Sequence, residues 1–592
     1  MCGIAGLMTR DGSPPEKALL DTMLEAFGHR GPDGEGFHIT QGVGLAQNRL
    51  AIIDLVTGDQ PIHEPGGAAI IANAEIYNYI ELRQELSDIR FSTSSDCEPP
   101  LHLYRKHGID FAQKLRGMYA IAIYDAPSDC LILARDPFGI KPLYYCEAAQ
   151  QFAFASEPRA LLAAGLAAPN INSLQRNELL QLQFTCGRQT IFGDIQRVMP
   201  GETLVVRGGR IVERRRIEAL PVEEETPRSA GSLDDTLQAL DRTLEKSVQI
   251  HQRSDVPYGL FLSGGIDSSA ILALMARLNE RPVQAFTVGF SGTGVHDERA
   301  HAKVVADSVG AEHHEVEFNE TDFWELLPQV AASVDDPAAD YAVLPTWKLA
   351  REAAQDLKVV LCGEGGDELF AGYGRYRSQL RPWWRGGRTL RARGIFDGLN
   401  VLRDEAQGWR DGFESAQTTA TLPHRSPLQI AQATDSADWL SNDLLTKLDR
   451  CLMSHGLEGR TPFLDREVAK IAFTLPDDMK IRKGAGKWLL RQWLQRVMPV
   501  ARPFERKRGF TVPVGEWIQR RGDTLGPLVA HHPAILEICR PDRVEKLFNS
   551  GKKRAGIASW VLLFYALWHQ SLISGQPSNA NVFDTLADST AI

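Results

Sequence analysis

The chain has 592 residues, of which 43% are hydrophobic and 24% are charged, and this size and composition exclude a single small binding module and a wholly disordered chain. Lysine and arginine number 65 against 75 aspartates and glutamates, a net charge of −10, which disfavours nucleic acid and anionic membranes as partners. The eight cysteines form no CxxC pair and no apolar run reaches the length of a membrane span. We therefore expect a cytoplasmic protein with reduced thiols and no zinc site.

The first 210 residues carry short, alternating apolar runs separated by turn residues. Residues 117–125 and 130–135, joined by Ala-Pro-Ser-Asp, predict a β-hairpin. Further strands are predicted at 69–72 and 151–155, and helices at 17–27 and 79–86. This mixture predicts an α+β domain with antiparallel sheet over residues 2–210. The proline-, glutamate- and serine-rich segment that follows predicts a linker over residues 211–232.

From residue 233 onwards, strands alternate with longer helical periods. Strands are predicted at 258–262, 284–288 and 359–361, and helices at 268–278 and 298–309. This alternation predicts βαβ units, a parallel sheet and a second domain over residues 233–575, mostly helical beyond residue 372. The polar, aperiodic residues 576–592 predict a flexible tail.

The first chemical signal is the run from Gly259 to Ser269, GLFLSGGIDSS, in which an apolar strand leads through a Ser/Gly turn into a helix. Such a turn presents backbone N–H groups and a helix N-terminus, which together bind phosphate. No Gly-Lys-Ser/Thr follows, so a phosphate-binding lysine has to come from elsewhere. Asp267 would repel phosphate unless a cation lies between them, which implies Mg²⁺. The alternative is a purely structural turn that closes a βα unit.

A second loop of the same kind begins at Val359 and reads VVLCGEGGDE. Loops at the carboxyl ends of parallel strands meet at one crevice, so Asp267 and Asp367 are predicted to hold one metal ion from two sides. Two loops of this kind are hard to explain as turns alone.

The two loops, SGGIDSS and GEGGDELFAGY, together resemble the PP-loop ATP site of the asparagine synthetase superfamily. The resemblance implies an α/β domain of the adenine nucleotide α-hydrolase type with a parallel sheet and added helices. It also implies an enzyme that adenylates a carboxylate, releases pyrophosphate and lets a nitrogen nucleophile attack. The ATP-binding residues implied are Leu262, Ser263, Gly264, Gly265, Asp267, Ser268, Ser269, Val288, Cys362, Gly363 and Glu364, with Glu364 also catalytic.

The N-terminus, Met-Cys-Gly-Ile-Ala-Gly, offers a second chemistry. Removal of the methionine would leave a thiol and a free α-amine on Cys2. An α-amine has a pKa near 8, so it can act as the general base for the thiol of its own residue. The alternative is an inert thiol, which is the commoner case for an isolated cysteine.

The motifs that follow resemble those of class II, Ntn-type glutamine amidotransferases, which implies a four-layer sandwich. They are HRGPD at 29–33, NRLAIID at 48–54, NAEIYN at 73–78, SD at 95–96 and RDPFGIKP at 135–142. By this match Arg49 binds the α-carboxylate of glutamine, Glu75 and Asp96 bind its α-ammonium, and Ile52 lies beside them. The side chain of Asn73 and the backbone N–H of Ala74 form the oxyanion hole for chemistry at Cys2.

Two later stretches complete the resemblance. Residues 457–465, LEGRTPFLD, resemble the segment that lines the synthetase pocket. Lys507, in the stretch 504–510, resembles the loop lysine that stabilises charge on the adenylate. The alternative is an ordinary solvated basic run, because Lys507 lies between two arginines.

Four positions depart from the family pattern: Ala74 replaces glycine, Cys362 serine, Gln47 histidine and Glu505 arginine. The Cβ of Ala74 would narrow the oxyanion hole and strain a backbone with positive φ. Less efficient glutamine hydrolysis is therefore predicted.

The resemblance implies hydrolysis of glutamine at Cys2, passage of ammonia through an interior channel, and amidation of aspartate activated as β-aspartyl-AMP, in a homodimer. One alternative is amidation of another carboxylate, in a specialised metabolite or a surface glycan. Ring closure without ammonia is disfavoured by Cys2, and a degenerate regulatory or scaffold protein would have to lack catalytic residues that are present. The basic, tryptophan-bearing segment 381–393 could suggest nucleic acid, but the net charge opposes this.

Overall fold

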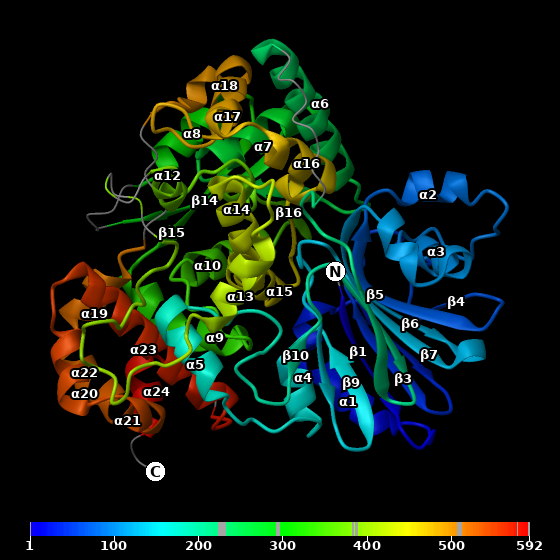
Figure 1. Ribbon diagram of the computed structural model, residues 1–592, viewed down its shortest axis with the longest axis horizontal. Helices are drawn as coiled ribbons and strands as arrows, with labels where there is room; N and C mark the ends of the chain where they lie inside the picture. The colour runs from blue at the N-terminus through cyan, green and yellow to red at the C-terminus, as the bar shows by residue number, and fades with distance from the viewer. Residues whose placement is uncertain are drawn as a thin grey trace.

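The computed structural model describes residues 2–222, 232–291, 297–381, 384, 387, 389–505, 512–576 and 578–589. Figure 1 shows the N-terminal sheets, in blue and cyan, beside a larger body of sheet and helices that runs from green to red. Among the described residues, no helix is both long enough and apolar enough to cross a membrane.

Two six-stranded antiparallel sheets form the centre of the N-terminal domain. In spatial order the first comprises β10 (Gln196–Arg197), β8 (Tyr144–Glu147), β9 (Gln151–Ala155), β1 (Gly3–Thr9), β3 (Val43–Arg49) and β2 (Gly34–Ile39). The second comprises β12 (Arg210–Arg216), β11 (Glu202–Arg207), β7 (Cys130–Arg135), β6 (Gly117–Asp125), β5 (Ala68–Ile76) and β4 (Ile62–His63). The hairpin of residues 117–135 is thus the pair β6 and β7.

Alternation along β1 explains the layering, because successive side chains of a strand point to opposite faces. Ile4 and Met8 pack into a core shared with the second sheet. Ala5 and Leu7 pack on the other side, against α1 (Lys17–Ala26) and α4 (Pro158–Ala163). The second sheet is covered on its outer face by α2 (Tyr79–Glu85) and α3 (Pro99–His107). The four-layer sandwich predicted from the motifs is confirmed.

The second domain contains a five-stranded parallel sheet in the order β15 (Glu312–Phe318), β14 (Gln284–Phe290), β13 (Tyr258–Phe261), β16 (Val359–Leu361) and β17 (Glu458–Arg460). The helices around it, in chain order, are α6 (Leu233–His251), α7 (Ile266–Leu278), α8 (Arg299–Asp307), α9 (Glu320–Ser333), α10 (Val343–Ala353), α11 (Gly366–Leu369), α12 (Gly374–Gln379), α13 (Asp411–Ala420), α14 (Pro427–Ala437), α15 (Thr446–Met453), α16 (Arg466–Thr474), α17 (Asp477–Lys480), α18 (Trp488–Val497), α19 (Val514–Arg520), α20 (Gly522–Ala530), α21 (Pro533–Ile538), α22 (Pro541–Phe548) and α23 (Lys553–Leu572). The parallel sheet and added helices predicted for a PP-loop domain are confirmed.

The two domains are not separate in packing. Helix α5 (Ser173–Leu182) belongs to the N-terminal part of the chain but lies among the C-terminal helices in Figure 1. Leu179 and Leu180 share a hydrophobic core with Trp568 of α23. The two domains therefore share a continuous apolar core.

Two predicted boundaries need correction. Residues 211–216, predicted to begin the linker, belong to β12, which pairs with β11 and so extends the sheet. The tail predicted at residues 576–592 is not wholly flexible, because 582–589 form α24 (Val582–Ser589). Val582 and Leu586 are fully buried, and Phe583 lies against Trp324 with a ring separation of 5.0 Å. Residues 223–231 of the predicted linker lie outside the described residues.

Candidate functional site

Cys2 lies at the start of β1, where the two sheets of the N-terminal domain meet. Its backbone N–H donates to Asn73 Oδ1 at 3.2 Å, which links the first sheet to β5 of the second. Register places Gly3 opposite Asn48, so Cys2 lies beside Arg49 at the end of β3. Burial raises the pKa of the Cys2 thiol, while the Leu50 backbone N–H and the charge of Arg49 act in the opposite direction. The thiol is thus buried beside polar groups that stabilise its anion.

Arg49 is 10% exposed at its side chain, and its guanidinium has two partners. NH2 donates to the Asp54 carbonyl oxygen at 2.5 Å, and NH1 donates to Asp59 Oδ1 at 2.6 Å. The Asp59 side chain is 84% exposed. A carboxylate therefore already lies where the α-carboxylate of glutamine is predicted to bind, and it is held on the solvent side.

The two acids predicted to bind the α-ammonium are buried in the same region. Asp96 Oδ2 accepts from the Ile76 N–H at 2.8 Å, and Ile76 ends β5. Burial raises the pKa of both Asp96 and Glu75, although the charge of Arg460 opposes the shift in each case. Ile52 is 2% exposed, and its carbonyl accepts from the Asp255 N–H at 3.0 Å. The structure thus brings the predicted glutamine-site residues to one region, at the boundary with the second domain.

Arg460 belongs to the segment 457–465, which the sequence assigns to the synthetase pocket, but sequence reasoning missed its contact with the N-terminal domain. It is fully buried in β17, and its NH2 lies 2.7 Å from Glu75 Oε2 while its Nε donates to Glu458 Oε1 at 2.6 Å. The segment 457–465, predicted to line the synthetase pocket, therefore turns charged side chains toward the N-terminal domain. Asp465 does the same, because it accepts a bidentate bond from Arg116 at 2.6 and 2.9 Å. A buried carboxylate costs free energy unless a buried cation pairs with it, and Arg460 supplies that cation for Glu75. A local sequence motif does not reveal such a pair, because its two members come from different domains.

The backbone argument about Ala74 is wrong. Ala74 lies inside β5, opposite Tyr119 of β6, and it is not among the described residues with positive φ. The backbone is extended there, and any residue adopts that conformation without strain. Gln47, another departure from the family, is 1% exposed and donates to the Ala72 carbonyl at 3.1 Å, so it bridges the two sheets.

The first glycine loop follows β13. Leu262 continues the strand through its N–H, which donates to Phe286 O at 2.8 Å, and Gly264 has a φ of +69°. The Ser263 and Ser268 hydroxyls lie 3.1 Å apart, and the Ser263 hydroxyl accepts from the Gly265 N–H at 3.2 Å. Gly265 caps α7, which begins two residues before the predicted start at Ser268. The remaining residues predicted for this side of the ATP site are Ser269, fully buried in α7, and Val288, 8% exposed in β14.

The second glycine loop lies against the first because β16 is the neighbour of β13 in the sheet. A Cβ on Gly366 would lie 2.4 Å from Asp267 Oδ1, and one on Gly363 would lie 3.0 Å from the Asp267 Cβ. A larger residue at 366 would therefore displace the Asp267 carboxylate from its present position. Cys362 donates through its N–H to Arg460 O at 2.7 Å, and burial raises the pKa of its thiol.

Lys487 is the second functional candidate that sequence reasoning missed. It precedes α18 with a φ of +57°, and its side chain is 1% exposed. Its Nζ forms ion pairs with Asp267 Oδ2 and, at 3.0 Å, with Asp367 Oδ1. Burial opposes the charge, but the two carboxylates outweigh it and raise the pKa of Lys487. The signal available in the sequence was a lysine after Gly484 and Gly486, directly before an amphipathic helix.

Asp267 and Asp367 both reach the Nζ atom of Lys487, and this geometry bears on whether the same two carboxylates could hold a metal ion. Two carboxylates that reach a single atom can share one cation, and Mg²⁺ commonly takes one or two carboxylates together with substrate phosphates. Among the described residues no cluster of three or more His, Cys, Asp or Glu forms a metal site from protein alone. The residues present fit a metal that arrives with a nucleotide.

Glu364 follows the second loop's first glycine and faces a lysine of α15. Burial raises the pKa of its carboxyl, and the charge of Lys447 opposes this shift. Lys447 Nζ lies 2.8 Å from Asp340 Oδ2, and both are mostly buried. Lys507 lies outside the described residues, so its predicted place at the adenylate stays a prediction. Glu505, by contrast, is exposed and lies 3.6 Å from Arg502.

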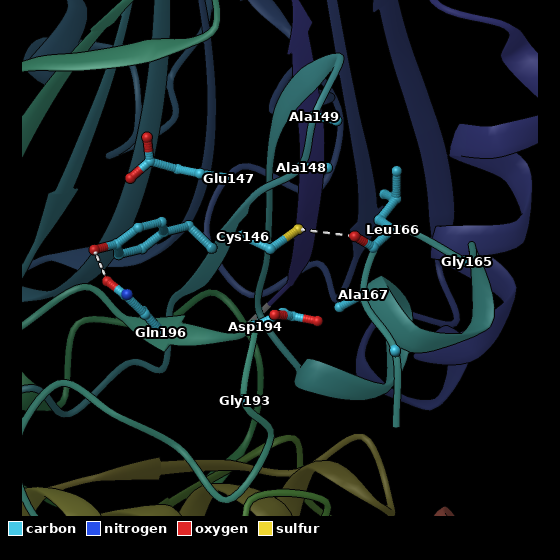
Figure 2. Close-up of a pocket in the computed structure, with 12 residues that line it drawn as sticks. Cys146, Glu147, Ala148, Ala149, Gly165, Leu166, Ala167, Gly193, Asp194 and Gln196 are labelled. Carbon is cyan, nitrogen blue, oxygen red and sulfur yellow. Dashed lines mark hydrogen bonds between the residues drawn. The ribbon is translucent and has the colours of Figure 1, made fainter. Parts of the chain in front are cut away.

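A separate pocket of about 460 Å³ opens at the far end of the first sheet. Figure 2 shows it between the β8–β9 hairpin and the loop at Asp194, with the Cys146 thiol donating to the Leu166 carbonyl at 3.6 Å. Strand β1 runs from beside Cys2 to Thr9, which pairs with Gln151 at that hairpin. Seven strand residues, about 23 Å, thus separate the pocket from Cys2, and none of the predicted site residues lines it.

Comparison with known proteins accounts for both halves of the chain. The family model for the glutamine amidotransferase domain matches residues 1–216, and the model for asparagine synthase matches residues 239–570. Asparagine synthetase [glutamine-hydrolyzing] 1 of Bacillus subtilis is 32% identical, over 96% of this chain and 96% of its own length. A putative asparagine synthetase [glutamine-hydrolyzing] of Mycobacterium tuberculosis is also 32% identical, over 96% of this chain and 97% of its own length.

A more distant relative shares only part of this arrangement. The amidase chyE of Penicillium rubens is 32% identical over 64% of this chain and 60% of its own length. The two full-length matches and the two family models agree with the fold and with the order of the two sites along the chain. The chain belongs to the asparagine synthase family, with a glutamine amidotransferase domain preceding the synthetase domain.

Proposed function

We propose that this protein is a glutamine-dependent asparagine synthetase, which converts aspartate, glutamine, ATP and water to asparagine, glutamate, AMP and pyrophosphate. The observation that carries the proposal is the pairing, in one chain, of a buried Cys2 at the junction of two sheets with two glycine loops whose carboxylates converge. The first arrangement is suited to acyl transfer from an amide, and the second is suited to binding a nucleoside triphosphate.

In the glutaminase half, Cys2 attacks the side-chain amide of glutamine. After removal of the methionine, the α-amine of Cys2 takes the thiol proton and gives it to the leaving ammonia. The Ala74 N–H and the Asn73 amide stabilise the oxyanion, because both donors are fixed before the reaction begins. Arg49 holds the α-carboxylate in exchange for Asp59, and Asp96 and Glu75 hold the α-ammonium. Water then releases glutamate from the thioester.

In the synthetase half, the N–H groups of the Ser263–Ser268 turn and the N-terminus of α7 bind the phosphates of ATP. Asp267 and Asp367 would hold Mg²⁺, which supplies charge neutralisation on the phosphate oxygens when bound. Lys487 supplies a further fixed positive charge at the same point, and Lys507 is assigned to the α-phosphate. The β-carboxylate of aspartate attacks that phosphorus and pyrophosphate leaves. Ammonia then attacks the activated carbonyl and displaces AMP, and Glu364 is assigned to take the proton that ammonia loses.

The test separates the two half-reactions. Cys2→Ala should abolish asparagine formation from glutamine and leave formation from ammonia intact, because the two sites lie in different domains. ATP should yield AMP and pyrophosphate, measured by chromatography. Loss of both activities in a folded Cys2→Ala protein, or formation of ADP and phosphate, would contradict the proposal.

The acceptor is tested in the same assay. Aspartate is assigned from the full-length relatives, whereas the partial match to an amidase suggests comparing other carboxylates. ATP–pyrophosphate exchange is measured with aspartate, glutamate and succinate in turn. Aspartate should stimulate exchange most strongly, and stronger stimulation by another acid would reassign the acceptor. A cytoplasmic homodimer completes the proposal, and sedimentation of the purified protein tests the dimer.

A further inference from the structure

The carbonyl of Cys2 is tied to the synthetase domain through one guanidinium group. Arg30 Nε donates to the Cys2 carbonyl oxygen at 3.3 Å. NH1 and NH2 of the same group donate to the two carboxylate oxygens of Asp449, at 2.7 and 2.9 Å. The Arg30 side chain is fully buried and that of Asp449 is 4% exposed. A bidentate arginine–carboxylate pair fixes the orientation of the guanidinium as well as its position.

Asp449 lies on α15, which also reaches the synthetase loops. Lys447 on the same helix is paired with Asp340, and its charge acts on Glu364. Residues two apart on a helix point in directions about 200° apart. Helix α15 therefore presents Lys447 to one active site and Asp449 to the other.

We propose that Asp449 is a positioning residue for Cys2 and acts through Arg30. The nitrogen of Cys2, which becomes the α-amine when the methionine is removed, is held by Asn73, and its carbonyl is held by Arg30, so both polar main-chain atoms of the residue are fixed. The direction of the thiol is then set by its side-chain torsion alone. The inference rests on the proposed role of Cys2 as the nucleophile, and it makes a synthetase helix part of the support of the glutaminase site.

The charges along this path favour a fixed arrangement. Arg30 NH1 also donates to Glu157 Oε1 at 2.8 Å, and Arg450 NH1 donates to Asp449 Oδ2 at 2.7 Å. Burial opposes the charge of Asp449, but Arg30 outweighs it and holds the pKa of that carboxyl below its usual range. Removing the charge at Asp449 weakens the bonds that orient NH1 and NH2 of Arg30. The Arg30 Nε that donates to the Cys2 carbonyl is then no longer held in place.

The experiment compares Asp449→Asn with the wild-type full-length protein. We expect the glutaminase kcat to fall about tenfold or more, since misplacement of a reacting group by about 1 Å can cost a hundredfold. The KM for glutamine should change less than twofold, because Arg49, Glu75 and Asp96 are untouched. Synthesis from ammonia should also change less than twofold, and alkylation of Cys2 by iodoacetamide should slow.

The matched control is Asp335→Asn. Asp335 is a fully buried aspartate of the same interface, where it accepts from Arg450 Nε at 2.7 Å and from the Arg159 N–H at 3.0 Å. Within the part of the chain that the structure describes, it makes no hydrogen bond to Arg30. Asp335→Asn should keep the wild-type glutaminase kcat. Equal losses in the two variants would mean that any loosening of the interface impairs the enzyme, and the inference would be overturned.

The remaining outcomes separate this inference from the proposed function. A wild-type kcat in Asp449→Asn, with glutaminase still lost in Cys2→Ala, overturns the role of Asp449 alone. Glutaminase activity that survives Cys2→Ala overturns the proposed function itself. If thermal unfolding shows that Asp449→Asn is not folded, Asp449→Glu keeps the charge and displaces the carboxylate by one methylene. A reduced kcat at unchanged KM then supports the inference, and a wild-type kcat contradicts it.

Discussion

At the scale of single residues, Lys487 is the buried cation that lies between the two carboxylates of the proposed nucleotide site. Lys487→Met removes the charge between Asp267 and Asp367 at nearly constant volume, which leaves two carboxylates facing each other and the phosphates. We expect asparagine synthesis to fall about 100-fold or more, equivalent to about 2.7 kcal/mol in the barrier. Glutaminase activity should be retained. Steady-state kinetics with ammonia and with glutamine measure both.

Lys483→Met is the control for that prediction. Lys483 lies four residues earlier in the same glycine- and lysine-bearing stretch, but it is exposed. Its loss should leave synthesis within twofold of wild type. Equal losses at Lys483 and Lys487 would indicate a general effect of positive charge and not a specific contact.

The structure changes the prediction for Ala74, because the sequence argument expected its Cβ to strain the backbone and impair glutamine hydrolysis. Because Ala74 lies in an extended strand, Ala74→Gly relieves no strain and makes the unfolded chain more flexible. We expect a loss of about 0.5–1 kcal/mol in the free energy of unfolding and no gain in glutaminase kcat/KM. Urea unfolding and glutaminase kinetics check this. A clear gain in kcat/KM would show that the methyl group obstructs the oxyanion hole.

The residues that sequence reasoning could and could not find differ in a physical way. Cys2, Asn73 and Asp267 lie in local motifs, where the spacing along the chain already carries the chemistry. Lys487 contacts Asp267, 220 residues earlier in the chain, and Arg460 contacts Glu75 of the N-terminal domain. Their partners are set by tertiary packing, which a local pattern does not encode.

At the scale of elements, helix α5 carries Glu178, whose buried carboxyl makes the free energy of unfolding depend on pH. Glu178 is 1% exposed and accepts from the Cys186 N–H at 2.8 Å. Burial raises the pKa of its carboxyl to about 8. The hydrogen bond from Cys186 lowers this pKa, and the negative charge of Asp438 raises it further. Between its ordinary value of 4.5 and 8, the folded protein holds a proton that the unfolded chain has lost. The contribution of Glu178 to stability is therefore present at low pH and is lost as the pH rises through this window.

Glu178→Gln keeps an acceptor for the Cys186 N–H and removes the titration. Relative to wild type, the variant should gain stability as the pH rises from 5 to 8, by at most about 1.4 kcal/mol per pH unit. Urea midpoints at the two pH values measure the change. Parallel pH profiles of the two proteins would contradict the prediction.

Element boundaries were predictable where turn chemistry is strong. The β6–β7 hairpin follows directly from alternation and the Ala-Pro-Ser-Asp turn. Strand β12 was missed because its arginine-rich sequence, RIVERRR, faces largely outward at the edge of the sheet and shows little apolar alternation. Helix α24 was missed because, among its described side chains, the buried positions Val582, Thr585 and Leu586 include a polar residue and so give only a weak apolar period.

At the scale of the whole molecule, the loop after Arg49 depends on the second domain. Leu50, Ile52 and Ile53 pack in one cluster with Val359 and Met453 of the synthetase domain. The Asp54 N–H donates to Asp255 at 2.8 Å, and the Asp255 N–H donates back to Ile52 O at 3.0 Å. Separation of the domains would expose this apolar cluster and free the loop beside the glutamine site.

We therefore expect residues 1–216, expressed alone, to be less stable than the same residues in the full chain and to hydrolyse glutamine more slowly. The apolar side chains of the cluster lose about 25 cal/mol for every Å² that becomes exposed to water. Thermal unfolding and glutaminase assays of the fragment and the full chain measure the difference. Equal melting temperatures and rates would mean that the N-terminal domain is independent of its neighbour.

The pair of Arg49 and Asp59 bears on how glutamine enters. In the free protein the anion on Arg49 is the chain's own Asp59. With glutamine as its ligand, entry is the replacement of one carboxylate by another, and the charge around the guanidinium is the same before and after. The displaced Asp59 moves into water, to which 84% of its side chain is already exposed. Added salt screens the outgoing and the incoming contact alike, so the contribution of Arg49 to glutamine affinity should depend little on the ionic strength of the medium.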